Sequence, residues 1–313
     1  MRRYLVTGGA GFIGSHLVGA LLETGAAVRV LDDFSTGKRA NLEGPLPSAA
    51  AGRLEILEGD IRDPQVVGQA CSGVEVVFHE AAFISVPESM DRPPECFDVN
   101  IKGTANVLEN ARQAGVRRVV IASSAAVYGD SEALPLGEEG APIPLSPYAV
   151  SKQVGEIYAA LYTRSLGLEV CALRYFNVYG PRQRPDTAYA AAVPVFIRRL
   201  RDKAAPTVYG DGNQTRDLIF VGDVVRANLM AAEHPAAAGK VFNVCTGRST
   251  RILDLLDALY ALMPGAPPPI FAHKRAGDID ASIGDPSKAE SVLGFSARSS
   301  LMEGLRETAE WMR

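Results

Sequence analysis

Short hydrophobic runs rich in β-branched residues alternate with longer amphipathic stretches along the first half of the chain. The runs that resemble β-strands are RYLVTG, AVRVLDD, LEILEGD, VEVVFHEAA and RRVVIASS. The stretches between them are helical in pattern: one begins at Phe12 and ends at Gly25, and another covers about 94–114 and ends at Gly115. This alternation predicts an α/β fold, a doubly wound parallel (Rossmann-type) sheet with helices on both faces.

The composition is that of an ordinary globular protein. Of the 313 residues, 47% are hydrophobic and 22% are charged, which argues against a collagen-like, low-complexity or disordered chain. Lys and Arg number 32 against 36 Asp and Glu, a net charge of −4, so no nucleic-acid or membrane partner is indicated. The sequence offers neither the apolar core of a signal peptide nor a bilayer-spanning run, so a cytoplasmic protein is expected.

Four cysteines lie far apart in the sequence: Cys71, Cys96, Cys171 and Cys245. They form neither a C-x-x-C pair nor a cluster with histidines, so the sequence indicates no metal site and no disulfide framework. We expect reduced thiols that are mostly buried.

Glycines follow the first predicted strand at positions 8, 11 and 14, in LVTGGAGFIG. Glycines there permit a tight turn and a close approach of the backbone to a pyrophosphate, which the N–H groups of the following helix can bind. The next strand ends in Asp32, eighteen positions beyond Gly14, where an acid accepts hydrogen bonds from the adenosine ribose hydroxyls. An acid also repels a 2′-phosphate, so the pattern favours NAD over NADP.

The pattern loosens past Tyr175, where proline and glycine interrupt the chain in NVYGPRQRP, VYGDGNQTRD and MPGAPPPIF. Such segments are typical of loops that cover a site. We predict an NAD-binding Rossmann domain over 1–176, with 217–247 packing back onto it. The ranges 177–216 and 248–313 are predicted to form a smaller C-terminal substrate-binding region.

A tyrosine and a lysine stand four positions apart in SPYAVSK, at the start of a helical pattern that continues through VGEIYAALYTRS. Residues four apart share a helix face, so Tyr148 and Lys152 are expected to lie together. A nearby ammonium lowers the pKa of a phenol from about 10 and makes it a useful proton-transfer group. The strand VVIASSAAVYG ends in Ser123 and Ser124, at the sheet edge where ligands bind in such folds.

These features together resemble the extended short-chain dehydrogenase/reductase family, specifically its nucleotide-sugar-modifying members. The motifs that carry the resemblance span the chain: TGGAGFIGSH, Asp32, GDIRD at 59–63, HEAA at 79–82, VN at 99–100 with Gly103, SSAAVYG at 123–129, YAVSK at 148–152, RYFNVYGPRQ at 174–183, TRDLIFVGDV at 215–224 and RAGD at 275–278. One departure from the family pattern is Glu80, in HEAA, which we interpret as a solvated acid at a strand end.

The resemblance implies a tightly bound NAD and a set of residues that hold it. That set is Gly8, Gly11, Phe12, Ile13, Gly14, Asp32, Asp60, Ile61, Ala81, Ala82, Asn100, Tyr148, Lys152 and Tyr175. It further implies that Ser124 and Tyr148 flank the reacting hydroxyl, and that Lys152 also holds the nicotinamide ribose.

The reaction class is narrowed by the two residues after Ser124. Relatives that eliminate water carry an Asp and a Glu there, and relatives that decarboxylate a uronic acid usually keep a glutamate at the second place. This chain has Ala125 and Ala126, which cannot transfer protons. The resemblance then implies a UDP-hexose 4-epimerase, which oxidises carbon 4 transiently and interconverts UDP-glucose and UDP-galactose.

Substrate contacts are implied by the same resemblance. They are Ser85, Ser124, Tyr148, Asn177, Tyr209 against the uracil, Arg216 and Arg275 on the phosphates, Asp278, and Ser282 beside carbon 2 of the sugar. Relatives that exclude an N-acetyl group carry a bulky tyrosine at the Ser282 position, so we expect UDP-GlcNAc and UDP-GalNAc to be accepted as well.

Two other functions remain open at this point. A UDP-glucuronate 4-epimerase or decarboxylase would need a cationic contact for the carboxylate, which the sequence does not identify. A catalytically silent NAD-binding regulatory protein would have no need of Tyr148, Lys152 and Ser124 together.

The resemblance also implies a homodimer in which helices over 94–113 and 148–165 pack against their symmetry mates. Both segments offer apolar residues on more than one face: Val107 and Leu108 in the first, Ile157 and Leu161 in the second.

Overall fold

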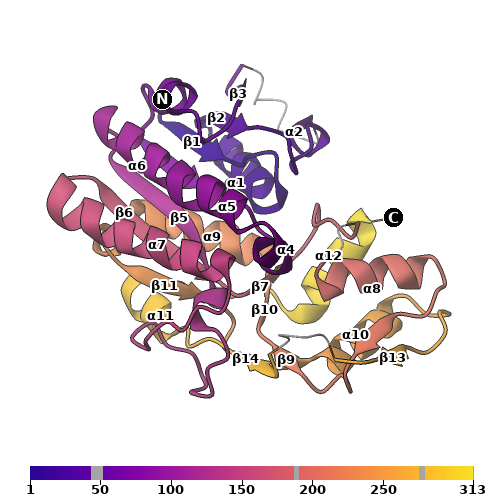
Figure 1. The fold of residues 1–313 in the computed structure, drawn as a ribbon. Coiled ribbons are helices and arrows are strands. Elements are labelled where there is room, and N and C mark those ends of the chain that lie inside the picture. The colour runs from indigo at the N-terminus through magenta and orange to yellow at the C-terminus, as the bar shows by residue number, and fades with distance from the viewer. Residues whose placement is uncertain (44–51, 187–189, 275–278, 313) are drawn as a thin grey trace.

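The computed structural model describes residues 1–43, 52–186, 190–274 and 279–312. Among these residues, seven parallel strands form a central sheet in the larger part of the molecule (Figure 1). The strands are β1 (Arg3–Thr7), β2 (Ala27–Asp32), β3 (Leu54–Glu58), β4 (Val76–His79), β5 (Arg118–Ser124), β6 (Glu169–Tyr175) and β11 (Val241–Val244). The predicted α/β fold with a doubly wound parallel sheet is confirmed.

The strands lie in the order β11-β6-β5-β4-β1-β2-β3, so the order along the sheet reverses between β1 and β4. Thr7 pairs with His79, and His79 with Ile121, so β1 and β4 end at the same level and β5 continues beyond them to Ser124. Ligands bind at such a reversal in open α/β sheets, because the loops that follow the two strands diverge to opposite faces.

Helices cover both faces of the sheet (Figure 1). One face carries α3 (Pro64–Cys71), α6 (Gly103–Gln113) and α7 (Pro147–Leu161), and the other carries α1 (Phe12–Glu23), α9 (Val221–Glu233) and α11 (Ser287–Leu293). Each strand contributes to both cores because its side chains alternate: Val119 and Ile121 face α6 and α7, whereas Val120 between them faces the other layer. This double burial explains the near-continuous hydrophobic runs of the sequence.

The predicted helix over 94–114 is interrupted in the structure. It consists of α5 (Pro93–Phe97), a π-helical turn (Asp98–Lys102) and α6, and Gly115 follows with a positive φ of 69°. π-Helical turns often mark functional sites, and this one contains Asn100, a predicted cofactor contact. The hydrophobic periodicity predicted the helix but could not reveal one extra residue in a single turn.

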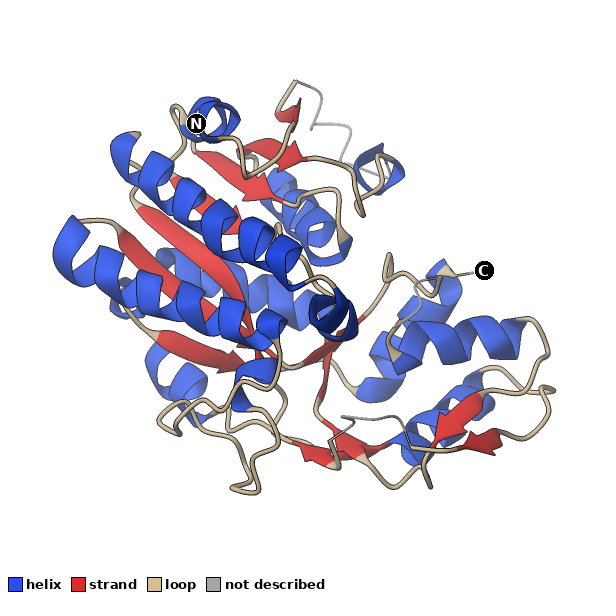
Figure 2. Cartoon of the chain, in the orientation of Figure 1, coloured by secondary structure: helices blue, strands red, loops and turns tan. Residues whose placement is uncertain are grey.

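A smaller part of the molecule is built from short strands and three helices among the described residues (Figure 2). Its elements are β7 (Asn177–Tyr179), β8 (Thr207–Tyr209), β9 (Thr215–Arg216), β10 (Leu218–Phe220), β12 (Thr250–Arg251), β13 (Ile270–Ala272), β14 (Ala281–Ser282), α8 (Ala192–Arg201), α10 (Ile252–Leu262) and α12 (Leu301–Trp311). Two short helices, α2 (Ala40–Glu43) and α4 (Val86–Asp91), follow β2 and β4.

The packing of the C-terminal elements can be compared with the predicted ranges of the NAD-binding domain and the smaller region. α9 and β11, from 217–247, pack with the large sheet. α11 also packs there, through Ala289 and Leu293, although it falls in the range 248–313 that was assigned to the smaller region. Its apolar residues cover the last strand of the sheet, which would otherwise expose one face. The domain boundaries themselves stay a prediction.

All four cysteines are buried and free, as expected of buried thiols. The described residues contain no group of three or more His, Cys, Asp or Glu side chains that could hold a metal ion. No helix among them combines the length and the apolar character needed to cross a bilayer.

Candidate active site

Polar side chains from several strands meet at the carboxyl edge of the large sheet. Asp32 ends β2, Ser124 ends β5, Tyr175 ends β6, and Glu80 directly follows β4. Because the strands are parallel, residues more than a hundred positions apart in the chain share this edge.

The glycine turn after β1 forms a cradle that side chains would fill. Gly8 has a φ of +66°, and a Cβ added there would lie 2.6 Å from the backbone N of Ala81. A Cβ at Gly14 would lie 2.2 Å from the carbonyl oxygen of Gly8. Gly11 gives α1 no side-chain cap, so the N–H groups of the first turn, at Phe12 and Ile13, are oriented for an anion. This geometry fits the pyrophosphate of NAD.

Asp32 is buried beside the cradle. Its two carboxylate oxygens accept hydrogen bonds from the backbone N–H groups of Ala10 and Phe34, each at 2.8 Å. Burial raises the pKa of Asp32, and these hydrogen bonds lower it. Each oxygen keeps a second lone pair, so the carboxylate can still accept from ribose hydroxyls, which fits the adenosine half of NAD.

Asp60 and Ile61 lie after β3, near the adenosine side of the cradle. Arg62 donates to Asp60 from its Nε at 2.8 Å, and this hydrogen bond lowers the pKa of Asp60. Ile61 is buried, and a Cβ added at Gly103 would lie 2.6 Å from its side chain. Ile61 therefore packs directly against the start of α6.

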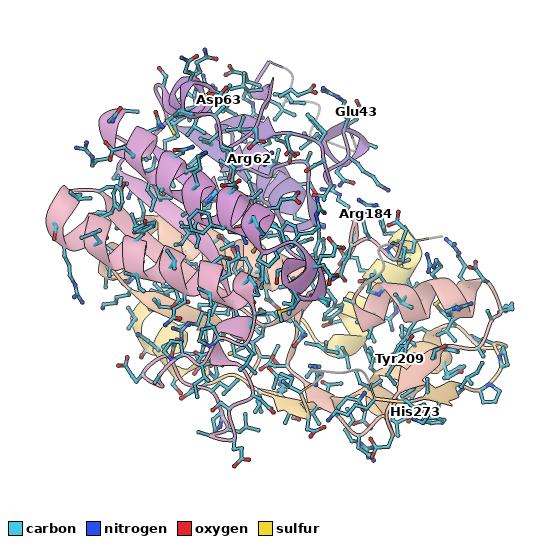
Figure 3. The ribbon with its side chains drawn as sticks, viewed as in Figure 1. Glu43, Arg62, Asp63, Arg184, Tyr209 and His273 are labelled. Carbon is cyan, nitrogen blue, oxygen red and sulfur yellow. The ribbon has the colours of Figure 1, made fainter. Side chains whose placement is uncertain are left out.

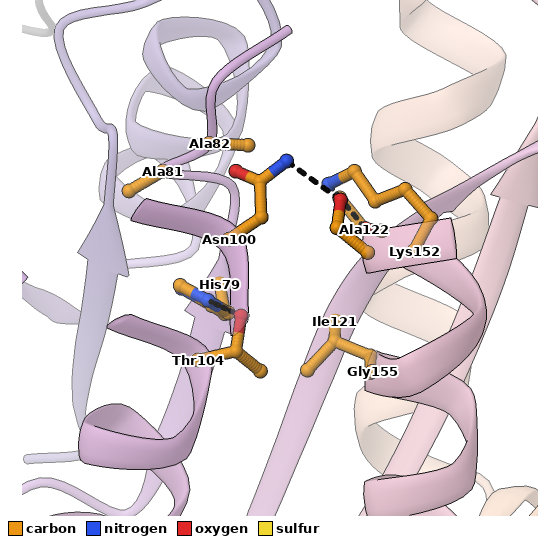
Figure 4. Close-up of a pocket in the computed structure, with 10 residues that line it drawn as sticks. His79, Ala81, Ala82, Asn100, Thr104, Ile121, Ala122, Lys152 and Gly155 are labelled. Atoms are coloured by element: carbon orange, nitrogen blue, oxygen red, sulfur yellow. Dashed lines mark hydrogen bonds between the residues drawn. The ribbon is translucent and has the colours of Figure 1, made fainter. Parts of the chain in front are cut away.

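A small cavity opens between α6 and α7 (Figure 4). Its lining is His79, Ala81, Ala82, Asn100, Thr104, Ile121, Ala122, Ser151, Lys152 and Gly155. Asn100 joins its two sides: its Oδ1 accepts from the N–H of Phe83 at 2.7 Å, and its Nδ2 donates to Ser151 Oγ at 2.9 Å. Burial lowers the pKa of His79 to about 3, so the imidazole is neutral between the hydroxyls of Thr7 and Thr104.

The predicted catalytic groups come together at the start of α7. Ser146 caps this helix by accepting from the N–H of Ala149 at 3.1 Å, which places Tyr148 in its first turn. The Ser124 hydroxyl lies close enough to the Tyr148 phenol to lower its pKa. Lys152 Nζ donates to the carbonyl oxygen of Ala122 at 2.8 Å and lies 5.6 Å from the centroid of the Tyr148 ring.

The expected lowering of the Tyr148 pKa is wrong for this arrangement. Burial raises the pKa of Tyr148 to about 12, and the Ser124 hydroxyl offsets only part of that rise. Burial likewise lowers the pKa of Lys152 to about 8, with the charge of Glu80 acting in the opposite direction. Both groups are driven toward their neutral forms because burial removes the water that stabilises charge.

Two ionisable groups at the site were not assigned a role by sequence reasoning. Glu80 is not simply solvated: its Oε1 accepts from the Tyr175 hydroxyl at 2.8 Å. Glu156 forms a buried ion pair with Arg174, with N–O distances of 2.8 and 2.7 Å, and accepts from Ser123 Oγ at 2.6 Å. A charged residue inside an otherwise hydrophobic run, such as Arg174 in VCALRYF, is the sequence signal that could have identified such buried groups.

The predicted substrate contacts lie on both parts of the molecule. Arg216 in β9 pairs with Ser282 in β14, and Ser282 is buried there. Asn177 is exposed at the start of β7, and Ser85 caps α4 by accepting from the N–H of Glu88. Tyr209 ends β8 on the smaller part, apart from Arg62 and Asp63 on the larger part (Figure 3). Arg275 and Asp278 lie outside the described residues.

Comparison with known proteins places this site in a family. The model of the NAD dependent epimerase/dehydratase family matches residues 4–245. UDP-glucose 4-epimerase from Mycolicibacterium smegmatis is 41% identical over 313 residues, which covers 99% of this chain and 98% of that protein. The chain belongs to the NAD dependent epimerase/dehydratase family, which confirms the family predicted from the sequence motifs.

Solved structures agree with this assignment. UDP-glucose 4-epimerase from Thermotoga maritima, solved with UDP-glucose, has a TM-score of 0.93 and 37% identity, and the match covers 99% of this chain and 98% of that chain. The Thermus thermophilus UDP-glucose 4-epimerase complex with NAD has a TM-score of 0.88 and 37% identity, covering 99% of both chains. NAD is the cofactor of this protein, as predicted.

Other matches differ in substrate or reaction. UDP-N-acetylglucosamine 4-epimerase from Methanobrevibacter ruminantium, solved with UDP-N-acetylmuramic acid, has a TM-score of 0.94 and 35% identity, covering 99% of this chain and 98% of that chain. UDP-N-acetyl-alpha-D-glucosaminuronate decarboxylase from Bacillus cytotoxicus is 32% identical over 325 residues, covering 100% of this chain and 98% of that protein. The sugar therefore has to be argued from the residues of this chain.

The close packing in the glycine cradle predicts what a substitution of Gly14 would do. Gly14→Ala would place its Cβ against the Gly8 carbonyl and should lower the free energy of unfolding by about 1–3 kcal/mol, with loss of bound NAD. Gly19→Ala in the same helix meets nothing within 4 Å and should be neutral or stabilising by up to ~1 kcal/mol. Urea unfolding and the NAD content of the purified variants check both. Equal stability and NAD content in the two variants would contradict a tight cradle.

Proposed function

We propose that the protein is a UDP-hexose 4-epimerase that interconverts UDP-glucose and UDP-galactose through transient oxidation at carbon 4. The observation that carries this proposal is that Ser124 lies beside the Tyr148 phenol, with Lys152 on the same helix as Tyr148, at the edge that holds the NAD cradle. Support also comes from Ala125 and Ala126, which follow Ser124 in a 3-10 turn and offer no acid for dehydration.

Side chains of this protein accept and return the proton of the reaction. Oxidation of the carbon 4 hydroxyl removes a hydride and a proton, and Tyr148 as phenolate accepts that proton while Ser124 hydrogen-bonds the same oxygen. Lys152 favours the phenolate by its positive charge. The chemistry that NAD supplies when bound is reversible hydride transfer, together with the positive charge of its oxidised ring. Return of the proton from Tyr148 completes a cycle without net oxidation.

Inversion requires the planar keto-sugar to offer its opposite face before reduction. The diphosphate must therefore stay bound while the sugar turns. Arg216, in the strand pair with Ser282, is suited to this task because a guanidinium binds phosphate oxygens in a bidentate manner and keeps its charge. Tyr209 and Asn177, from the same part of the molecule, are the other proposed contacts.

Incubation of the purified protein with UDP-galactose, UDP-GalNAc and UDP-glucuronate, without added NAD, tests the proposal. We expect UDP-glucose from the first and UDP-GlcNAc from the second, with no net NADH. Release of carbon dioxide from UDP-glucuronate would favour the decarboxylase alternative. A 4-keto-6-deoxy product would contradict the proposal, and no turnover of any substrate would favour a silent NAD-binding protein.

Tyr148→Phe should lower turnover by about 10²–10⁴-fold and leave UDP-sugar binding largely intact, because it removes the proton-transfer group alone. Tyr158→Phe is a matched control in the same helix, since Tyr158 packs against Tyr162 and lies about three turns farther along α7. Steady-state kinetics on UDP-galactose provides the measurement. Near-wild-type turnover of Tyr148→Phe would exclude this residue from the mechanism.

Substrate breadth is proposed to depend on Ser282. This serine lies in β14 beside Arg216 and is 4% exposed, and its side chain is much smaller than that of a tyrosine. Ser282→Tyr should reduce activity on UDP-GalNAc far more than on UDP-galactose, whereas Ser282→Ala should retain both. Thermal unfolding verifies that the variants are folded. An equal loss on the two substrates would show that this position does not select the sugar.

We also propose that the protein is a homodimer through α5 and α7. Val107 and Leu108 do not support such an interface, because both are buried in the core of their own chain. Ile157 and Leu161 do support it, since they are 58% and 45% exposed on α7, and Phe97 on α5 is 55% exposed. A stripe of exposed apolar side chains on neighbouring helices suits a self-complementary contact.

Ile157→Glu should therefore convert a dimer into a monomer at micromolar concentration, because it buries a charge in the contact. Ile270→Glu is the control: Ile270 is 59% exposed on β13, in the smaller part. Sedimentation velocity distinguishes the states. A monomeric wild-type protein would refute the proposed dimer.

The cytoplasmic location expected from the sequence stays a prediction.

A further inference from the structure

A buried aspartate lies where strands of the smaller part meet the large sheet. Asp217 stands between β9 and β10 and is fully buried. β10 pairs in parallel with β7, and both strands lie between the two parts of the molecule (Figure 1). The backbone carbonyl of Asp217 accepts from the N–H of Asn177 at 3.1 Å. Asp217 therefore contacts the connection that runs from β6 of the large sheet to β7.

The carboxylate of Asp217 holds two further connections. Its Oδ1 accepts from the N–H of Thr246 at 2.8 Å and from the Oγ1 hydroxyl of Thr246 at 2.7 Å. Its Oδ2 accepts from the N–H of Gly247 at 2.9 Å and from the N–H of Gly284 at 3.3 Å. Thr246 and Gly247 follow β11 of the large sheet, and Gly284 follows β14. Among the described residues the carboxylate forms no ion pair, so these neutral donors stabilise it.

The three connections also pack directly on one another. A Cβ added at Gly284 would lie 2.6 Å from Cys245 Sγ and 2.6 Å from the ring of Phe176. Cys245 and Phe176 belong to the connections that follow β11 and β6. The residues at 176–177, 245–247 and 284 thus form a junction between the two parts, with Asp217 as their common hydrogen-bond acceptor.

Three proposed substrate contacts lie directly beside these hydrogen bonds. Arg216 immediately precedes Asp217, and Asn177 donates its N–H to the carbonyl of Asp217. Ser282 lies two residues before Gly284 and pairs with Arg216 in the strands β14 and β9. An aspartate that fixes the connections relative to one another therefore also fixes the relative positions of these three residues.

The number of donors explains why an aspartate suits this place. Four hydrogen-bond donors reach the side chain, two at each oxygen, and an ionised carboxylate has a lone pair for each of them. An asparagine has one oxygen, and its NH₂ group can only donate. In either orientation of that amide, a backbone N–H on one side would face another donor and lose its acceptor.

We propose that Asp217 is a positioning residue: its hydrogen bonds hold the three substrate contacts beside it in the arrangement that binds the diphosphate and the sugar. Because Asp217 is fully buried, it acts through the backbone of its neighbours and not by contact with the substrate. Loss of its carboxylate should weaken nucleotide binding and leave the proton-transfer groups on β5 and α7 in place. The effect on binding rests on the proposed function, but the hydrogen bonds of the junction do not.

Hydrogen exchange tests the junction without any substrate. The NAD-containing protein is transferred to heavy water, and peptides over 246–250 and 279–285 are followed by mass spectrometry. In Asp217→Asn we expect exchange in these ranges to be faster by roughly tenfold, because backbone N–H groups lose their acceptor. Peptides from α6 should exchange as in the wild type. Unchanged exchange over both ranges would overturn the proposal.

Asp223→Asn is a matched control on another connection between the two parts. Asp223 is buried in α9, and its oxygens accept from the N–H groups of Arg298 and Ser299, each at 3.0 Å. It also pairs with Arg226. The connection that it holds, between α11 and α12, carries no proposed substrate contact. We expect both aspartate variants to lower the midpoint of thermal unfolding, but only Asp217→Asn to weaken nucleotide binding.

Calorimetry with UDP and the NAD-containing protein measures that binding. The Kd for UDP should rise by roughly 10- to 100-fold in Asp217→Asn and by less than about twofold in Asp223→Asn. The NAD content should stay at the wild-type level in both variants, because the glycine cradle lies between β1 and α1. Wild-type affinity in Asp217→Asn would contradict the proposal. Equal weakening in the two variants would attribute the effect to general destabilisation and would also contradict it.

Thr246 offers a milder change that decides the question even if Asp217→Asn does not fold. Thr246→Val removes the hydroxyl donor at nearly constant volume, and Thr246→Ser keeps it. The valine variant should weaken UDP binding by roughly two- to tenfold, whereas the serine variant should bind UDP as the wild type does. The same affinity in both variants would count against a role for these hydrogen bonds and would refute the proposal.

Turnover separates a positioning role from a catalytic one. Asp217→Asn should raise the KM for UDP-galactose by roughly 10- to 100-fold and change kcat by less than about threefold, since the proton-transfer groups belong to the larger part. A lower kcat with an unchanged KM would overturn the proposal. A wild-type protein that neither binds UDP nor turns over a UDP-sugar would instead refute the epimerase function, and hydrogen exchange would still decide whether Asp217 holds the junction.

Discussion

The parallel alignment of the strands is the constraint on which the site depends. In a parallel sheet every strand ends at the same edge, and the reversal of strand order between β1 and β4 leaves room there for a ligand. The glycine cradle after β1, Asp32 after β2 and Ser124 after β5 are brought together by this geometry alone. Any slip of register would move the polar ends of the strands away from one another and expose the core.

Positioning of α7 is the second requirement, since this helix carries Tyr148 and Lys152. It is held against the sheet by the buried ion pair between Glu156 and Arg174. Ser151 connects its first turns to Asn100 in the π-helical turn. A buried ion pair adds little net stability because desolvation opposes it, but its directional hydrogen bonds define where a helix sits along and around its axis.

Burial is the main cause of the shifted pKa values at the carboxyl edge of the sheet. It raises the pKa of Tyr148 to about 12 and that of Glu80 to about 7, and it lowers the pKa of Lys152 to about 8. A low-dielectric site disfavours each isolated charge but strengthens the interaction between charges. The ionisation of any one group therefore depends on its charged neighbours, including the cofactor that this family binds.

Much of the fold and site followed from the sequence because the relevant signals are local. Hydrophobic runs of strand length, the glycines at 8, 11 and 14 and the acid at 32 lie within short segments whose geometry the backbone determines. The four-residue spacing of Tyr148 and Lys152 likewise predicted one shared helix face.

Only the tertiary structure decided which distant groups share an environment. The pKa of Tyr148, the hydrogen bond from Tyr175 to Glu80 and the burial of both Val107 and Leu108 depend on contacts between segments far apart in the chain. Local pattern cannot report these contacts, because desolvation and charge interactions depend on distance in space. The sequence by itself determined the elements and the cofactor cradle, and packing determined the protonation and partners of the groups placed on them.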